Sequence, residues 1–238
     1  MMQGESVFQQ RIGRAVENYH KILFLLPKYS HNGNVPQLII VTKSQPVELV
    51  SELITRLKKP IFGENRVNEA LTKIDICGIT EAKWHFIGHL QRNKVKKVLG
   101  KFSMIQSLDS LQLVKEIEKR AVKINKSVKC LLQIDICQDG SKFGIPPNID
   151  EVEEFLTELE KFPHIQIKGL MTMAPYVPPE DTRVYFRQMR GLYDILKKEK
   201  SLPPNVAIEI LSMGMSNDFL VALQEGSTMI RLGTAIFN

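Results

Sequence analysis

The chain has 238 residues, of which 43% are hydrophobic and 24% charged, a composition ordinary for a folded globular protein with a substantial core. No stretch approaches the ~20 apolar residues of a membrane span, and the polar start MMQGESVFQQ lacks the basic and apolar regions of a secretory signal. We therefore expect a cytoplasmic protein, and the net charge of +6 leaves nucleic-acid binding to be judged from the local pattern of basic residues.

The first 36 residues precede the repeating part of the sequence. Apolar residues recur there at intervals of mostly three or four, at Phe8, Ile12, Ala15, Tyr19, Ile22, Leu23 and Leu26. This spacing predicts an amphipathic helix that packs on the exterior or the floor of the remaining structure. The segment from His31 to Pro36 (HNGNVP) predicts a turn into the first strand.

From residue 37 onward, a short β-rich run, a polar loop and a helical pattern alternate along the chain. The predicted strands are Gln37–Thr42, Pro60–Gly63, Lys83–Gly88, Phe102–Ser107, Val128–Ile136, Ile165–Met171, Val206–Leu211 and Thr228–Leu232. The main helical patterns are Val47–Leu57, Arg66–Ile74, Ser110–Lys123, Ile149–Lys161, Thr182–Lys198 and Asn217–Gln224.

Eight such alternations, with strands that are apolar on both faces, favour an α/β fold with one closed parallel (β/α)₈ TIM barrel over an open doubly wound sheet. No long linker marks a second domain. We expect a single domain over residues 1–238, with the barrel in residues 37–238 and the eighth strand at the end of the protein.

The basic segment from Gln91 to Lys101 (QRNKVKKVLGK) is the strongest candidate for nucleic-acid binding. Leu90, Val95, Val98 and Leu99 fall near helical spacing, and no aromatic residues interleave with the lysines. These features favour the solvated face of an amphipathic helix and no nucleic-acid partner. The three cysteines are odd in number and lack close metal-ligand spacing, so we expect small buried side chains rather than disulfides or a metal site.

Lys43 closes the apolar run LIIVTK and is followed by Pro46, so its amine is expected at the carboxyl end of a buried strand. A partly desolvated lysine at such a position can attack an aldehyde as the free amine. Because most lysines are solvated surface charges, a surface role is the alternative when Lys43 is considered alone.

The loops after the seventh and eighth strands are the places where this fold often holds a phosphate group. The candidate residues are Ser212, Gly214 and Ser216 in the first loop, and Arg231, Gly233 and Thr234 in the second. Backbone N–H groups, glycine and hydroxyl groups can form a cradle for a phosphate. The alternative is a simple turn in which Asn217 or Asp218 caps the next helix.

Other strand ends add polar groups that can face the same opening. Glu64 and Asn65 follow the second strand, and Asn65 is either a ligand contact or the N-cap of the next helix. His89 follows the third strand, where a packed surface residue is the favoured interpretation. Lys142, in the loop after the fifth strand, is a second candidate amine.

A lysine at one strand end and a phosphate cradle at another match pyridoxal 5′-phosphate, which carries an aldehyde and a phosphate on one molecule. The sequence also resembles the pyridoxal phosphate homeostasis proteins, single-domain relatives of the alanine racemase amino-terminal barrel. The matching segments are VTKSQP at 41, FGENRVNEA at 62, WHFIGHLQRNK at 84, SKFG at 141, GLMTMAP at 169, LSMGMSNDFLVAL at 211 and GSTMIRLGTAIF at 226.

The resemblance implies that Lys43 forms the Schiff base, that Arg231 lies beside the cofactor, and that Ser212, Gly214, Ser216, Gly233 and Thr234 surround the phosphate. In the related racemases the matching arginine faces the pyridine nitrogen, and by analogy Arg231 would keep that nitrogen unprotonated. Thr42 and Ser44 (TKS where relatives often have SKT), Arg66 and Asp135 depart from the family pattern, but none of these changes removes the amine or the cradle.

Three functions remain open at this point. The favoured one is a non-catalytic carrier of pyridoxal phosphate in vitamin B6 homeostasis, which is expected to be monomeric and to pass the cofactor to dependent apoenzymes. A small amino-acid racemase is the alternative, but it needs a second base that related racemases take from an added domain and a partner subunit, and Tyr176 is a poor substitute. The third is a cofactor-free Schiff-base aldolase that acts on a small phosphorylated substrate.

Overall fold

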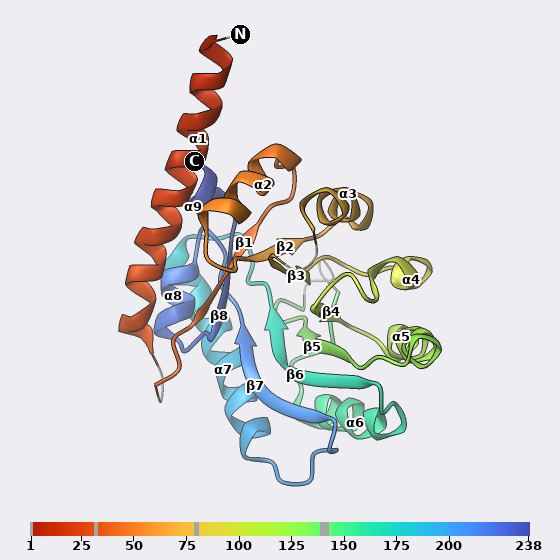
Figure 1. Cartoon of the computed structure of the whole chain (residues 1–238). Helices are drawn as coiled ribbons and strands as arrows, with labels where there is room; N and C mark the ends of the chain where they lie inside the picture. The colour runs from red at the N-terminus through yellow and green to blue at the C-terminus, as the bar shows by residue number, and fades with distance from the viewer. Residues whose placement is uncertain (1, 31–32, 79–80, 139–142) are drawn as a thin grey trace.

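The computed structural model describes residues 2–30, 33–78, 81–138 and 143–238. In this part of the chain, eight parallel strands close into one barrel in the order β1 to β8, and helices surround it (Figure 1). Strand β1 pairs with both β2 and β8, which closes the barrel. The predicted TIM barrel is confirmed, and the open sheet is excluded.

Every predicted strand is present, and each end lies within two residues of its predicted position. The strands are β1 Gln37–Val41, β2 Ile61–Glu64, β3 Lys83–Phe86, β4 Met104–Leu108, β5 Val128–Ile134, β6 Ile165–Thr172, β7 Val206–Ser212 and β8 Met229–Leu232. Their side chains alternate between the barrel interior and the surrounding helices, which explains why both faces of each strand are largely apolar.

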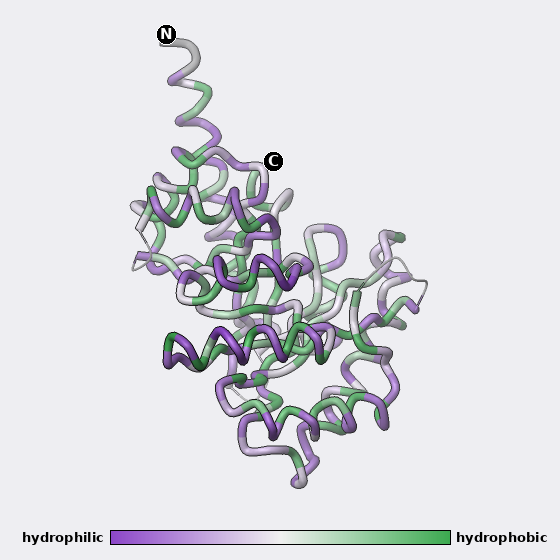
Figure 2. The backbone as a smooth tube through the Cα atoms, turned by 90° about the vertical axis from the view of Figure 1, so that its right-hand side faces the viewer, coloured by the Kyte–Doolittle hydropathy of each residue, from purple (hydrophilic) through white to green (hydrophobic). Residues whose placement is uncertain are grey.

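The helices that follow the strands are α2 Val47–Arg56, α3 Val67–Cys77, α4 Val95–Val98, α5 Leu111–Ile124, α6 Ile149–Glu158, α7 Arg183–Lys198, α8 Phe219–Gln224 and α9 Thr234–Phe237. Short 3₁₀ turns are η2 Arg92–Lys94, η3 Leu159–Lys161 and η4 Pro179–Thr182. Hydrophilic and hydrophobic stretches alternate along these helices, as expected for elements with one face on the barrel (Figure 2). The expectation that the eighth strand ends the protein is wrong, because α9 follows β8 and contributes to the site described below.

The basic segment confirms the predicted amphipathic pattern but forms less helix than expected. Val95 and Val98 are buried, whereas Lys96 and Lys97 are exposed. The helical part is limited to η2 and α4 because Gln91 and Leu99, at its two ends, are both extended.

The amino-terminal helix α1 (Met2–Leu25) lies on the barrel exterior beside α9, followed by the 3₁₀ turn η1 Leu26–Tyr29 (Figure 1). Its predicted apolar face is largely buried, with Ile12, Ala15, Tyr19, Ile22 and Leu26 all at most 9% exposed. The Nδ2 atom of Asn18 donates to the carbonyl oxygens of Ile236, at 3.1 Å, and Asn238, at 3.2 Å. The helix therefore holds α9 against the barrel. None of the described helices combines the length and apolar character of a membrane span.

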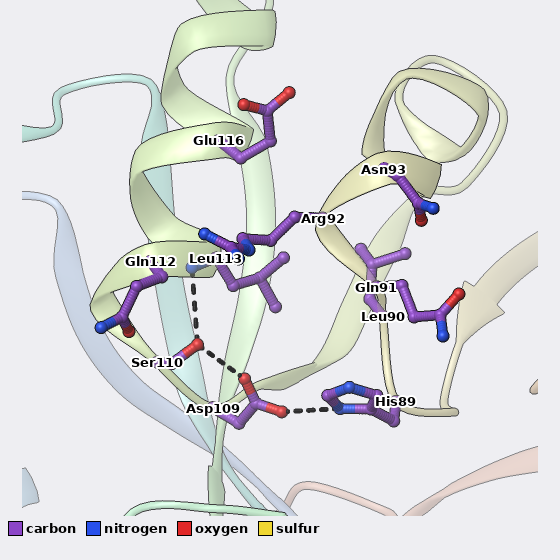
Figure 3. Close-up of a pocket in the computed structure, with 10 residues that line it drawn as sticks. All are labelled: His89, Leu90, Gln91, Arg92, Asn93, Asp109, Ser110, Gln112, Leu113 and Glu116. Atoms are coloured by element: carbon purple, nitrogen blue, oxygen red, sulfur yellow. Dashed lines mark hydrogen bonds and ion pairs between the residues drawn. The ribbon is translucent and has the colours of Figure 1, made fainter.

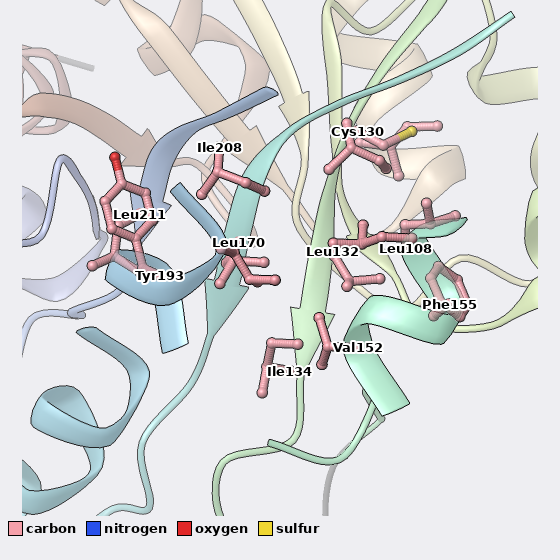
Figure 4. Close-up of a cluster of buried hydrophobic side chains, with 14 of the residues drawn as sticks. Leu108, Cys130, Leu132, Ile134, Val152, Phe155, Leu170, Tyr193, Ile208 and Leu211 are labelled. Carbon is pink, nitrogen blue, oxygen red and sulfur yellow. The ribbon is translucent and has the colours of Figure 1, made fainter. Parts of the chain in front are cut away.

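The core between the strands and the outer helices is continuous along one side of the barrel. Figure 4 shows part of it, in which Leu132 and Ile134 of β5 face Val152 and Phe155 of α6. Each such buried side chain contributes about 1.5–3 kcal/mol relative to an exposed one. Cys130 belongs to this core, and burial raises the pKa of its thiol to about 12. Cys77 and Cys137 are only partly buried, so the expectation of buried cysteines is confirmed for Cys130 alone.

Candidate functional site

A cavity of about 580 Å³ opens at the carboxyl ends of the strands, the place at which the fold is expected to carry its site. Its wall is formed by Val41, Lys43, Gln45, Asn65, Ile87, Gly88, His89, Gln133, Phe143, Met173, Tyr176, Met215, Ser216, Asn217, Arg231, Gly233, Thr234, Phe237 and Asn238. Six of the eight predicted site residues are among them. The other two, Ser212 and Gly214, lie behind the wall.

Lys43 lies in the turn directly after β1, as predicted, but it is exposed rather than buried. Val41 and Lys43 both line the cavity, whereas the intervening Thr42 is fully buried and points away from it, as alternation along an extended chain requires. Within the described residues, the amine of Lys43 makes no hydrogen bond or ion pair. It is therefore free to react with a ligand in the cavity.

A buried ion pair fixes the backbone directly before Lys43. Lys73, on α3, places its Nζ atom 2.6 Å from Oε1 of Glu64 and 2.6 Å from the carbonyl oxygen of Thr42. The hydroxyl of Thr42 donates to the same carboxylate oxygen at 2.7 Å. Sequence reasoning placed Glu64 at a strand end but missed Lys73, whose only signal is a charged residue on the apolar face of α3 between Ala70 and Ile74.

The loops after β7 and β8 form a cradle of hydrogen-bond groups at the cavity. The hydroxyl oxygen of Ser216 accepts hydrogen bonds from the backbone N–H groups of Gly233, at 3.2 Å, and Ala235, at 3.1 Å. A phosphate oxygen is a stronger acceptor for such N–H groups, and the hydroxyl can rotate to donate to it. A Cβ on Gly233 would lie 3.4 Å from the carbonyl oxygen of Val41, so glycine leaves this wall of the cavity open. Thr234, beside it, is exposed to the cavity.

Gly214 supports this loop from behind rather than lining the cavity. Its φ of +95° lies in the region that favours glycine, and a Cβ there would be 2.6 Å from the Cβ of Ala222. Its carbonyl oxygen accepts the backbone N–H of Arg231 at 3.0 Å. The glycine therefore allows the loop after β7 to pack closely against α8 and β8.

Arg231 lies at the floor of the cavity and is 4% exposed. One terminal nitrogen donates to the hydroxyl of Ser212 at 2.6 Å, and the other donates to the carbonyl oxygen of Thr172 at 2.7 Å. Burial lowers the pKa of its guanidinium to about 10, and the charge of Asp218 opposes this shift. The group therefore remains a cation at neutral pH. Ser212 is fully buried beneath it, with its hydroxyl already engaged.

Asn65 lines the cavity after β2, and its side-chain oxygen Oδ1 is buried without a hydrogen-bond partner among the described residues. It does not cap α3, because the residue at that N-cap position is Arg66. Since buried acceptors are normally paired, the atom is suited to accept a hydrogen bond from a ligand.

His89 separates the cavity from a larger surface cleft of about 910 Å³. Its ring stacks on Phe143 with centroids 3.6 Å apart. Figure 3 shows its contact with Asp109, in which Nδ1 of His89 lies 3.0 Å from Oδ2 of the carboxylate. Ser110 donates to the other oxygen of Asp109 and caps α5 by accepting from the N–H of Leu113. The predicted packed surface residue thus also forms part of the wall. The candidate site is the smaller cavity, because the strand ends converge on it. Lys142 lies outside the described residues.

Comparisons with known proteins identify the family to which this chain belongs. The model of the alanine racemase amino-terminal domain matches residues 28–238. The chain is 40% identical to the pyridoxal phosphate homeostasis protein of Aquifex aeolicus over 230 residues, which cover 96% of each protein. It is 36% identical to the protein of the same name from Pasteurella multocida over 206 residues, which cover 84% of this chain and 85% of that protein.

Solved structures similar to this chain include a family member with and without a bound cofactor. PipY of Synechococcus elongatus, solved without PLP, matches with a TM-score of 0.82 and 32% identity over 94% of this chain and 99% of PipY. The form with PLP bound matches with a TM-score of 0.80 and 31% identity, over 94% and 100%. Alanine racemase of Clostridium difficile, at 18% identity and a TM-score of 0.70, shares the fold over 92% of this chain and 55% of its own. The chain therefore belongs to the family of pyridoxal phosphate homeostasis proteins, which is built on the alanine racemase amino-terminal domain.

Proposed function

We propose that this protein binds pyridoxal 5′-phosphate, carries it as a Schiff base on Lys43, and takes part in intracellular vitamin B6 homeostasis without catalytic turnover. The observation that carries the proposal is that Lys43, Ser216 and Gly233 line one cavity of about 580 Å³, where the hydroxyl oxygen of Ser216 accepts hydrogen bonds from two backbone N–H groups. The family membership and the PLP-bound relative support it.

The polar groups of the cavity fit the chemistry of this cofactor. The free amine of Lys43 suits its aldehyde, and the convergent N–H groups suit its phosphate dianion. The unpaired oxygen of Asn65 can accept a hydrogen bond from the ring hydroxyl, and the donors of Arg231 suit an acceptor on the ring. Each group of the ligand thus finds a partner of the opposite hydrogen-bonding type.

Each side chain has one task in this proposal. Bound pyridoxal phosphate supplies an electrophilic aldehyde carbon and an electron-withdrawing ring. Lys43 provides the amine that attaches to this carbon, and the ion pair of Glu64 and Lys73 holds the preceding backbone. Ser216 and its two N–H partners hold the phosphate, while Arg231 donates hydrogen bonds at the floor without giving up its proton. No described side chain is assigned to proton transfer from an amino-acid substrate.

Borohydride reduction of the loaded protein, followed by peptide mapping, tests the attachment site. We expect modification of Lys43, unchanged labelling in a Lys97→Ala control, and none at this position in Lys43→Ala. Labelling of another lysine would refute the assignment. If the protein shows no absorbance of a bound Schiff base, even after pyridoxal phosphate is added and the excess removed, the proposal fails and the cofactor-free aldolase remains.

Absence of turnover is tested separately with a panel of enantiopure amino acids. A racemase needs a base on each face of the bound substrate, and the candidate Tyr176 is 92% exposed at the cavity rim. We expect no change in optical rotation. Clear racemisation that Lys43→Ala abolishes would favour the racemase alternative.

We further propose that the chain works as a single-domain monomer in the cytoplasm and passes its cofactor to dependent apoenzymes. Light scattering measures the molar mass in solution and so tests whether the protein is a monomer. The rate at which the loaded protein activates a cofactor-free enzyme tests the transfer. A transfer rate no faster than that of release into buffer would contradict a direct handover.

A further inference from the structure

A chain of hydrogen bonds crosses the barrel interior beneath the cavity floor. Arg231 of β8 donates to the hydroxyl of Ser212 of β7 at 2.6 Å, and this hydroxyl donates to Oε1 of Gln106 of β4 at 2.8 Å. The Nε2 atom of Gln106 lies 2.9 Å from Nδ1 of His85 of β3. All four side chains are at most 4% exposed. Sequence reasoning had assigned no role to Gln106 or His85.

Arg231 sets the direction of the first hydrogen bond in this chain, and the orientation of the Gln106 amide in the structure sets the others. A guanidinium donates but cannot accept, so the oxygen of Ser212 must be the acceptor in their contact. The hydroxyl proton of Ser212 is then directed to the carbonyl oxygen of Gln106, which leaves the amide N–H₂ of Gln106 facing His85. Nδ1 of His85 must therefore be an unprotonated acceptor, and its remaining proton is on Nε2.

The burial of His85 agrees with this assignment. Burial, together with the charge of Lys83, lowers the pKa of His85 to about 4, so the imidazole is neutral at physiological pH. The second amide proton of Gln106 is directed to the sulfur of Met229 at 3.2 Å. Both amide protons of Gln106 therefore have an acceptor in this orientation.

We propose that Gln106, Ser212 and His85 are positioning residues that hold Arg231 as a fixed hydrogen-bond donor toward the cavity, so that the site selects a ligand whose buried end is an unprotonated acceptor. Two of the five N–H donors of Arg231 are used by Ser212 and Thr172, and the side chain lines the cavity. The inference rests on the proposed function, in which the acceptor is the ring nitrogen of pyridoxal phosphate.

The specificity arises because an unpaired buried donor is costly. A ligand without the acceptor would leave an N–H of Arg231 without a partner and would bind roughly ten- to a hundredfold more weakly. If Arg231 is released from its orientation, it can turn away from such a ligand, and the difference shrinks. The quantity to measure is therefore the ratio of the affinities for ligands with and without the acceptor, because a general loss of packing weakens both equally.

The test measures dissociation constants for pyridoxal phosphate and for its analogue with carbon in place of the ring nitrogen. In the wild type we expect the analogue to bind roughly ten- to a hundredfold more weakly. In Gln106→Met, which is similar in shape but accepts no hydrogen bond from Ser212, we expect the ratio to fall toward one, with a shifted absorbance maximum of the bound cofactor. Ser212→Ala should act in the same direction.

Ser107→Ala is the matched control. Ser107 is also fully buried on β4, but its hydroxyl has no hydrogen-bond partner among the described residues. We expect this variant to keep the wild-type ratio. A wild-type ratio in folded Gln106→Met and Ser212→Ala, or an equal change in Ser107→Ala, would overturn the proposal.

The unloaded protein offers a second test that does not depend on the cofactor or on the stability of a variant. Nitrogen NMR of labelled histidine should show His85 as the neutral tautomer protonated on Nε2. The opposite tautomer, or an imidazolium at pH 7, would contradict the hydrogen-bond directions. A wild type that binds neither ligand but shows the expected tautomer would refute the proposed function and leave the orientation of Arg231 standing.

Discussion

The most demanding prediction concerns Lys73, which sequence reasoning did not identify. Its side chain is 6% exposed, and that of its partner Glu64 is fully buried. In Lys73→Met the carboxylate of Glu64 would keep only the hydroxyl of Thr42 as a donor, since its other oxygen has no partner among the described residues. Removal of one member of a buried ion pair costs about 3–5 kcal/mol, because the remaining charge is neither solvated nor neutralised.

For a protein of this size, each kcal/mol corresponds to roughly 2–4 °C in melting temperature, so we expect a decrease of about 6–20 °C. Urea unfolding gives the free energy directly. The matched control is Lys101→Met, because Lys101 makes a similarly short 2.7 Å pair with Asp75, but the two side chains are 43% and 60% exposed. Its loss should cost less than about 1 kcal/mol.

The double variant Lys73→Met/Glu64→Gln distinguishes the buried charge from lost packing. It replaces both charged groups, and we expect it to be more stable than Lys73→Met alone. The reasoning is refuted if Lys73→Met costs no more than Lys101→Met, or if neutralising Glu64 recovers nothing.

Three further predictions address other parts of the molecule. The pKa of His85 is lowered to about 4, so its neutral form stabilises the fold above pH 6.5, and this contribution declines as the pH falls toward 4. In urea unfolding, the free energy of unfolding of the wild type should therefore fall by about 2 kcal/mol more than that of His85→Gln between pH 7 and pH 5. Gly214→Ala should lower the free energy of unfolding by about 1–3 kcal/mol, whereas Gly13→Ala, on α1 with open space around it, should not be destabilising. Ser216→Ala should weaken binding of pyridoxal phosphate about tenfold in equilibrium titration but leave binding of unphosphorylated pyridoxal unchanged, and equal losses for both ligands would contradict a phosphate contact.

The barrel could be predicted from the sequence because its signals are local. Runs such as Leu38 to Val41 are apolar on both faces and are followed by turn residues, which marks buried parallel strands. The helix α9 could not be predicted in this way. Its four residues are too few for a periodic pattern, and it is held by a contact from Asn18, more than two hundred positions earlier in the chain.

The difference between local signals and long-range contacts also explains which candidate site residues could be predicted from the sequence. Lys43, Ser216 and Thr234 follow strand ends, so the fold class alone was enough to bring them together. Gln106 and Lys73 lie within regular elements, and their only local signal is the position of Lys73 on the apolar face of α3. Their roles depend on which strands and helices meet across the barrel, which is information that only the closed structure contains.

The site therefore combines a rigid floor with an accessible amine. Arg231 is fixed from below by a buried hydrogen-bond chain, whereas Lys43 is exposed on a turn and has no partner among the described residues. An amine that is open to water allows water or another amine to reach the bond that it forms with an aldehyde, so exposure favours release as much as attachment. An enzyme that retained its cofactor through many reaction cycles would gain from shielding this bond. The combination of selective recognition at the floor and easy exchange at the rim is suited to a carrier that must both capture its cofactor and give it up.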